Sequence, residues 1–205
     1  LEAVTSNGWA LEYATPKLQA DYDIVLTAVK DEGWALQYAS ARLQADYEVV
    51  LEAAKNAGWA LRYACEMLRE DKDLVLEIVK RNGWALQYAD DKLKADREVV
   101  ETAVEQNNSA LKHADHSLKA DREFMLERVK KDGWALDYAD EALKSDREVV
   151  LEAVKQSGWA LQCADDALKA DREVVFEAVS ENSLALGYAS LHLRRDKELK
   201  KMANF

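Results

Sequence analysis

Aspartate recurs along this chain in steps of 25 residues, without an insertion or deletion. The eight copies are Asp21, Asp46, Asp71, Asp96, Asp121, Asp146, Asp171 and Asp196. An Ala-Leu pair keeps the same step from Ala10-Leu11 to Ala185-Leu186, and a second leucine keeps it from Leu18 to Leu193. A fixed period of roughly 20–50 residues indicates stacked repeats, not one compact core.

The repeat at residues 146–170 predicts a first helix, helix A. Asp146 is an N-cap residue type, because its carboxylate can accept the unpaired N–H groups of a first helical turn. An apolar stripe with helical spacing follows at Val149, Val150, Ala153 and Val154. Lys155 and Gly158 are typical of a helix C-terminus, with glycine as the cap. Helix A is therefore expected over roughly residues 147–156.

A second helix, helix B, is expected from Trp159 onward, where apolar residues again follow helical spacing. In the first repeat Thr15 and Pro16 interrupt this segment, and proline suits the first position of a helix. The position before it is a capping type in most other repeats. We therefore expect helix B to span six or seven residues, followed by one further turn of 3₁₀ type.

The fold class predicted is an all-α, short-helix tandem-repeat solenoid with 25-residue repeats. Helices of about ten residues are marginal in water, so each must bury its stripe against the next repeat. We expect a single α-solenoid over residues 1–205 with about eight repeats. Residues 1–20 would form a partial first repeat and residues 196–205 a C-terminal capping helix.

The sequence at the two ends of the chain leads to different predictions about what covers each terminal repeat. Lys200 and Lys201 stand where other repeats have apolar residues, and a terminal repeat needs such a polar outer face. Residues 1–4 match residues 151–154, so the chain begins inside a helix A. We expect further repeats upstream or a partner covering this N-terminal layer.

The repeat pattern D-R-E-V-V-L-E-A-V-K-x-x-G-W-A-L-x-Y-A-D-x-x-L-K-A resembles that of the family called domain of unknown function 4116. The resemblance covers essentially the whole chain. It implies a repeat array, and it carries no established activity, cofactor or catalytic residue to transfer.

The composition limits the classes of partner that the chain is expected to bind. The formal net charge of −11 argues against nucleic acid, because phosphate binding needs a basic surface. No run of about 18 apolar residues is present, so no membrane insertion is expected. Cys65 and Cys163 fit no disulfide framework, which favours a reducing intracellular compartment without identifying it.

Nothing in the sequence predicts an enzyme, a cofactor or a metal site. Carboxylates recur in every repeat, as Glu48, Glu98 and Glu148 illustrate, which is typical of a structural role. No phosphate-binding glycine loop, nucleophile elbow or Cys/His dyad occurs. His113 and His116 have helical metal-ligand spacing, but no second cluster supplies further ligands.

Tryptophan occupies one repeat position, at Trp9, Trp34, Trp59, Trp84, Trp134 and Trp159. These residues could form an exposed aromatic ladder or pack between repeats. Their place beside the buried Ala-Leu pair favours packing, so we expect mostly buried indoles. The recurring tyrosines should likewise bury their rings and direct the hydroxyl to water or a carbonyl.

The repeat at residues 96–120 departs from the pattern. Glu101, Asn108, Ser109 and His113 replace leucine, glycine, tryptophan and tyrosine. This is either drift in a weaker repeat or a place where a partner fills the missing aromatic volume. The candidate partner-contact residues are Ser109, Lys112, His113 and His116.

Three functions remain open from the sequence. The first is a non-enzymatic scaffold that presents an extended surface to protein partners, lined by the variable residues Gln37, Arg62, Gln87, Lys112, Asp137 and Gln162. The second is a structural linker subunit of a large assembly, such as an organellar or photosynthetic complex. The third is small-ligand binding along the aromatic ladder.

Overall fold

The computed structural model describes residues 7–204, and every regular element in that range is helical. The predicted all-α tandem-repeat solenoid is confirmed as the fold class, since within each unit the long helices and the 3₁₀ helices pack against their counterparts in the adjacent repeat. The contacts divide the chain into two compact units, unit one at residues 1–114 and unit two at residues 115–205. The expectation of a single solenoid across both units stays a prediction.

Each repeat contains three elements. The long α-helices are α3 (Tyr22–Asp31), α5 (Tyr47–Asn56), α7 (Lys72–Val79), α9 (Arg97–Gln106), α11 (Arg122–Lys131), α13 (Arg147–Gln156) and α15 (Arg172–Glu181). The 3₁₀ helices are η1 (Gly8–Tyr13), η2 (Gly33–Tyr38), η3 (Gly58–Tyr63), η4 (Gly83–Tyr88), η5 (Asn108–His113), η6 (Gly133–Tyr138), η7 (Gly158–Cys163) and η8 (Ser183–Tyr188).

The third element is a single α-helical turn. These turns are α2 (Pro16–Gln19), α4 (Ala41–Gln44), α6 (Glu66–Arg69), α8 (Asp91–Lys94), α10 (His116–Lys119), α12 (Glu141–Lys144) and α14 (Asp166–Lys169). After η8 the pattern changes to a short 3₁₀ helix and one more α-helix, which are η9 (Leu193–Arg195) and α16 (Lys197–Met202).

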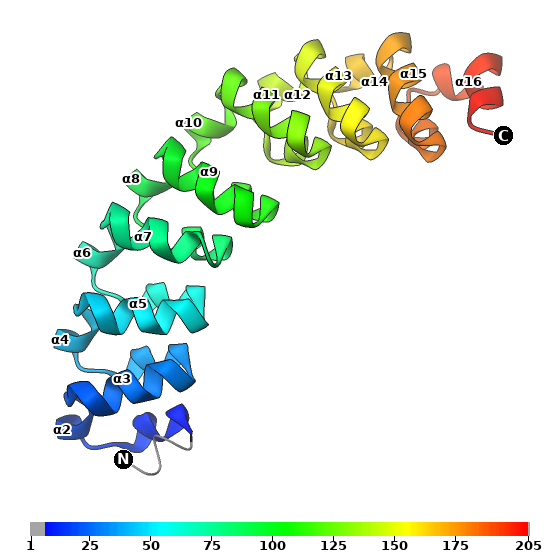
Figure 1. The fold of residues 1–205 in the computed structure, drawn as a ribbon. Helices are drawn as coiled ribbons and strands as arrows, with labels where there is room; N and C mark the ends of the chain where they lie inside the picture. Colours follow the sequence, from blue (N-terminus) through cyan, green and yellow to red (C-terminus); the bar gives the residue numbers. More distant parts are fainter. Residues whose placement is uncertain (1–6, 205) are drawn as a thin grey trace. The chain divides into compact units, whose positions relative to one another are not determined.

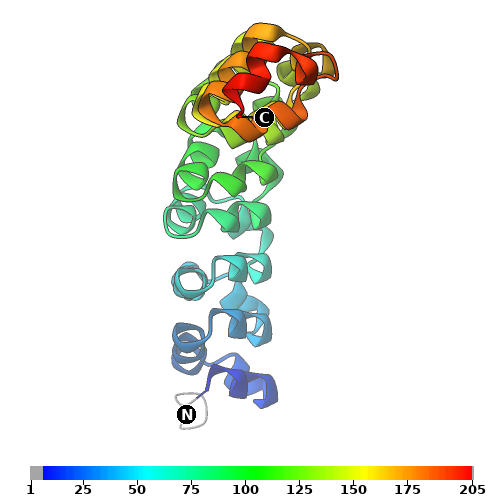
Figure 2. The same cartoon turned by 90° about the vertical axis from the view of Figure 1, so that its right-hand side faces the viewer.

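Within each unit the repeats form two packed layers. In unit one the long helices α3, α5, α7 and α9 lie side by side, and the turns α2, α4, α6 and α8 follow one edge (Figure 1). Turned by 90°, the same unit shows two columns of helices (Figure 2). Long helix packs on long helix and 3₁₀ helix on 3₁₀ helix, and unit two repeats this arrangement.

Aspartate caps every long helix, as predicted. In α13 the Asp146 carboxylate accepts the backbone N–H groups of Glu148 and Val149 at 3.0 and 3.1 Å. All eight aspartates of the 25-residue series accept such a bond. The observed bounds of α13 match the expected residues 147–156.

The predicted apolar stripe forms the core. Fully buried side chains on α13 are Val149, Val150, Ala153 and Val154. Ala160 and Leu161 of η7 are also fully buried, so the two layers share one apolar interior.

Helix B has the expected length but not the expected type. It is the six-residue 3₁₀ helix, and the further turn expected to be 3₁₀ is α-helical. The final N–H of η7, from Ala164, bonds the carbonyl of Leu161 at 3.2 Å, three residues back. The backbone then extends through Ala164 and Asp165, and Asp165 caps a new helix through the N–H of Ala167 at 2.8 Å. A 3₁₀ helix suits such a short segment.

Gly158 is not a left-handed helix cap, contrary to the sequence prediction. No glycine among residues 7–204 has a positive φ. Helix α13 ends in extended backbone at Ser157, and Gly158 begins the next helix. Glycine is needed there because a Cβ would lie 2.3 Å from the carbonyl oxygen of Ala178 in the next repeat. At Gly83 the corresponding distance, to Ala103, is 2.2 Å.

Backbone hydrogen bonds join neighbouring repeats at the edge of the short turns. The N–H that precedes each turn donates to the carbonyl at the end of the previous turn. In unit one these pairs are Ser40 to Gln19, Cys65 to Gln44 and Asp90 to Arg69, and in unit two Asp140 to Lys119, Asp165 to Lys144 and Ser190 to Lys169. These bonds, at 2.8–3.0 Å, fix the step from one repeat to the next.

In α16, Leu199 is fully buried while Lys200 and Lys201 are exposed. The polar outer face expected of residues 196–205 is therefore present where the structure describes them, and their capping role stays a prediction. The uncovered layer expected at residues 1–4 lies outside the described residues. Within residues 7–204, no helix has the length and apolar character needed to cross a membrane.

The close approach at Gly158 predicts the effect of adding one methyl group. Gly158→Ala should lower the free energy of unfolding by about 1–3 kcal/mol, because the new Cβ overlaps the Ala178 carbonyl. Gly187→Ala is the matched control, since nothing lies within 4 Å of a Cβ there. Urea denaturation should separate the two variants, and equal stability would contradict this role of glycine.

Candidate interaction surface

The 3₁₀ helices present one face to solvent. Side chains three residues apart in a 3₁₀ helix lie above one another, so the second and fifth positions share a face. In η4 these are Trp84 and Gln87, while Ala85 and Leu86 are fully buried. In each unit we call the second and fifth positions of its 3₁₀ helices, η1–η5 in unit one and η6–η8 in unit two, the indole face of that unit.

The tryptophans are mostly exposed, so the prediction of mostly buried indoles is wrong. Trp84 and Trp134 are each 42% exposed, and Trp9 and Trp59 are 49% and 37% exposed. Trp159 is half-buried, and Trp34 is buried at 8%. The sequence argument assumed an α-helix, in which a residue beside Ala-Leu would turn inward. The three-residue turn instead directs it outward.

Aromatic contacts support several of the indoles from one side, whether the indole is buried, half-buried or exposed. The Trp34 and Trp59 rings meet Tyr38 and Tyr63 of their own repeats edge-on, with centroids 5.9 and 6.3 Å apart. Trp159 instead meets Tyr188 of the next repeat at 5.8 Å. Such pairs favour one orientation of each indole.

The tyrosine prediction is only partly right. The rings of Tyr38, Tyr63, Tyr88, Tyr138 and Tyr188 are half-buried, and Tyr13 is 85% exposed. Burial, followed by the neighbouring Glu12 carboxylate, raises the pKa of Tyr38 above its usual range. That phenol therefore stays protonated at neutral pH and can act as a hydrogen-bond donor.

The candidate partner-contact residues do not belong to one unit. Ser109, Lys112 and His113 lie on η5 in unit one, and His116 begins α10 in unit two. Their joint role stays a prediction, and each is described within its own unit.

Each of these residues has a local structural setting. Lys112 is exposed, and the backbone N–H of Ser109 donates to the capping Asn107 side chain at 2.9 Å. The His113 ring meets Trp84 at 5.7 Å, as Tyr188 meets Trp159, so histidine takes over the tyrosine contact. The exposed His116 ring lies 3.8 Å from the Asp140 carboxylate. Across residues 7–204, no group of three or more potential ligands is arranged around a metal position.

The variable positions lie on the indole face and remain open to solvent. Arg62, Lys112 and Asp137 are exposed, and the three glutamines are half-buried. In unit two, Asp137 accepts from the Cys163 thiol at 3.6 Å. Burial, together with this carboxylate, raises the pKa of Cys163 to about 11. The thiol is therefore protonated at neutral pH and is a poor nucleophile.

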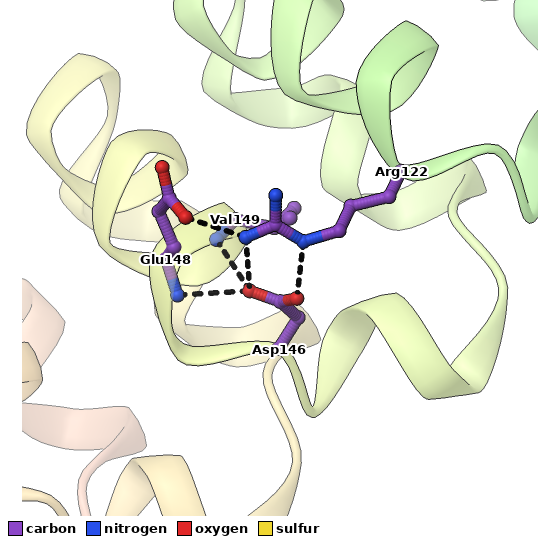
Figure 3. Close-up of polar contacts among 4 residues, drawn as sticks. All are labelled: Arg122, Asp146, Glu148 and Val149. Atoms are coloured by element: carbon purple, nitrogen blue, oxygen red, sulfur yellow. Dashed lines mark hydrogen bonds and ion pairs between the residues drawn. The ribbon is translucent and has the colours of Figure 1, made fainter.

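The recurring carboxylates form a charged row between repeats. Arg122 in α11 donates from Nε to Asp146 at 2.7 Å and from Nη2 to Glu148 at 2.5 Å (Figure 3). The same Asp146 still caps α13, so one carboxylate joins the helix end to the previous repeat (Figure 3).

Neighbouring repeats make the same contact. Arg147 pairs with Asp171 and Glu173, and Arg172 with Glu198. In unit one, Lys72 pairs with Asp96 and Glu98 at 2.8 and 2.9 Å. Sequence analysis missed this row, although the spacing of 24 and 26 residues between base and acids indicates it. These carboxylates bind bases and backbone amides, which is a structural role.

The residues that stabilise the repeat stack are therefore different from the residues that face solvent. Glycine, alanine, leucine, aspartate and arginine positions hold the repeats together. The indole face has solvent-exposed aromatic rings and residues that differ between repeats. Such a face can bind a partner.

The chain belongs to the family described as Domain of unknown function (DUF4116), whose profile matches residues 1–41, 21–69, 71–119, 121–169 and 171–203. Four of the five matches begin at a helix-capping aspartate of the 25-residue series. The resemblance noted in the sequence is thus confirmed. No curated protein and no solved structure matches the chain.

Quenching of tryptophan emission should report the exposure of the indoles. Acrylamide, which is uncharged, should quench most of the emission of the folded protein, because four indoles are well exposed. Trp34→Phe should raise the quenchable fraction by removing the one buried indole. Trp84→Phe, the matched control, should lower it slightly. Emission that is largely protected in the wild type would show that the rings are buried.

Acid should weaken the row of arginines and carboxylates. The Arg122 and Arg147 guanidinium groups hold the pKa of Asp146 and Asp171 below the ordinary value of 3.8. A depressed carboxyl pKa stabilises the fold above 3.8, and this contribution is lost as the pH falls through the folded-state pKa.

The triple variant Arg122→Gln, Arg147→Gln, Arg172→Gln should therefore melt below the wild type at pH 7. The difference in melting temperature should shrink as the pH falls below 3.8. A difference that stays constant from pH 7 to pH 3 would contradict the electrostatic origin.

Proposed function

We propose that this chain is a non-enzymatic scaffold that binds a protein partner on its indole face. The observation that supports this is the exposure of tryptophan at the same position of four 3₁₀ helices, η1, η3 and η4 in unit one and η6 in unit two. Apolar groups gathered at the surface mark interaction sites, and tryptophan contributes more than most residues to binding energy when a partner covers it.

The charge of the chain indicates the chemistry of the partner. A formal charge of −11 favours a partner whose contact surface is basic. Lysine and arginine side chains also bind over the face of an indole ring. A protein surface with basic and apolar side chains therefore fits the indole face better than an acidic one.

Capture from a native extract tests the proposal. The 205-residue chain should retain a partner, and Trp59→Ser with Trp84→Ser should release it. Serine is a suitable replacement because Ser109 occupies the equivalent position in this chain. Met67→Ser is the control, since Met67 is 82% exposed on α6 and lies off the indole face.

If the wild type, the double tryptophan variant and the Met67→Ser variant all retained the partner, binding at the indole face would be contradicted. A partner that exchanges with added competitor supports a scaffold. A partner that co-purifies at fixed stoichiometry and does not exchange supports a structural linker subunit, such as one of an organellar or photosynthetic assembly.

Small-ligand binding along the aromatic ladder is a second candidate, favoured by the same exposed rings. A small ligand bound there would quench tryptophan emission of the purified chain in the absence of any protein partner. The variant with Trp59→Ser and Trp84→Ser should lose this quenching.

A further inference from the structure

A polar pocket of about 240 Å³ lies in unit one between neighbouring repeats. Its walls come from η3, α6, η4 and α8, and α6 and α8 are neighbouring turns in Figure 1. The pocket contains the cations Arg62, Arg69 and Lys94 and the carboxylates Asp90 and Asp91, together with Gln87. Its lining thus has a formal charge of +1 (3 − 2), in a chain whose formal charge is −11.

The two carboxylates already have partners. Asp91 pairs with Lys94 Nζ at 3.0 Å. Asp90 caps α8 by accepting the backbone N–H of Lys92 at 2.9 Å. Neither carboxylate lies within ion-pair distance of Arg62 or Arg69 in the described structure.

The two guanidinium groups are not neutralised. Arg69 Nε is buried and has no hydrogen-bond partner among residues 7–204. The Arg62 guanidinium lies over the Tyr63 ring, 5.2 Å from its centroid, and is otherwise exposed. A buried N–H without an acceptor costs free energy, so this donor favours a ligand that supplies one.

The repeat pattern shows that the fold does not require these arginines. Arg62 corresponds to Gln37 and Gln87 in the repeats on either side. Arg69 corresponds to Gln44, whose Nε2 donates to the carbonyls of Leu36 and Gln37 at 3.1 and 3.2 Å. Glutamine is thus sufficient at both positions. Arg69 corresponds to Lys94 in the repeat that follows, so the additional cation at this place is Arg62, which lies beside these two.

We propose that Arg62 and Arg69, with Lys94 beside them, form an oxyanion-binding site for a phosphate or carboxylate group. A guanidinium presents paired N–H donors that match the two oxygens of either group. One water molecule needs roughly 10–15 Å³ of such a cavity, so the pocket has room for an oxyanion and several waters. This site goes beyond the proposed scaffold function, because no indole lines it and it needs no protein partner, although Arg62 and Gln87 also belong to the indole face.

Calorimetric titration of the 205-residue chain with inorganic phosphate, and separately with succinate, tests the site. The wild type should bind one equivalent of at least one of the two. Arg62→Gln and Arg69→Gln should each weaken binding by at least tenfold, because each removes one charged donor. Both variants introduce the residue found at the same position in the preceding repeat, Gln37 or Gln44, so their melting temperatures should stay near that of the wild type.

Arg42→Gln is the matched control. Arg42 belongs to unit one, donates to the Ala20 carbonyl at 3.3 Å and does not line the pocket. It removes the same charge and should leave binding unchanged. Equal weakening in all three variants, or no saturable binding to the wild type, would overturn the proposal.

Two further titrations are needed. The first identifies the kind of molecule that supplies the oxyanion, and the second shows whether anion binding is independent of the proposed scaffold function. A short phosphoserine peptide that binds more tightly than phosphate indicates an anionic side chain, and the reverse indicates a small free anion. The variant with Trp59→Ser and Trp84→Ser should still bind the preferred anion. Failure of the scaffold proposal would therefore leave this result intact, and loss of anion binding in that variant would contradict a site that binds without the indoles.

Discussion

The close approach of glycine to the next repeat is the tightest constraint on the stacking, met at Gly33, Gly83, Gly133 and Gly158, while Asn108 and Ser183 occupy this position in two repeats. A Cβ at Gly133 or Gly158 would lie 2.3 Å from a carbonyl oxygen of the following long helix. Only a residue without a side chain lets the 3₁₀ helix and that long helix meet at this distance. This separation in turn brings the inter-repeat backbone bonds and the charged row within hydrogen-bond distance.

The same constraint explains why the residues that stabilise the stacking and the residues available for binding occupy different positions of the 3₁₀ helix. The first and fourth residues of each 3₁₀ helix face the neighbouring repeat, as Gly83 and Leu86 do in η4. The second and fifth lie toward solvent, because three residues complete a turn, although the partly exposed Trp84 ring still meets His113 of the next repeat at its edge. Trp84 and Gln87 can therefore change without disturbing the stacking, which lets each repeat present different chemistry on one framework.

Much of the fold follows from the sequence, because local signals and long-range packing agree in the long helices. Asp146 and the stripe beginning at Val149 specify a start and a buried face without knowledge of any neighbour. Gly158 was misread because its role depends on the next repeat, which a local cap rule does not consider. Trp84 was misread because α-helical spacing was assumed in a segment too short to show its period. Arg122 and Asp146 could have been paired from their spacing, had the constant step been used to compare successive repeats.

The candidate site was harder to predict for the same reason. Departure from the pattern marked Ser109 and His113, yet His113 keeps the aromatic contact of the tyrosine it replaces. Arg62 was named in the sequence only as one of the variable surface residues, and Arg69 was not singled out, because an arginine at a variable position is common. Only the structure shows that they share a pocket and that the nearby carboxylates pair elsewhere.

The central claim is that residues such as 83–88 form 3₁₀ helices that direct tryptophan to solvent. A crystal structure of the chain tests it most directly. The account predicts hydrogen bonds between residues three apart in this segment, with the Trp84 indole on the surface. An α-helical segment with hydrogen bonds four residues apart and the indole packed between repeats would contradict it.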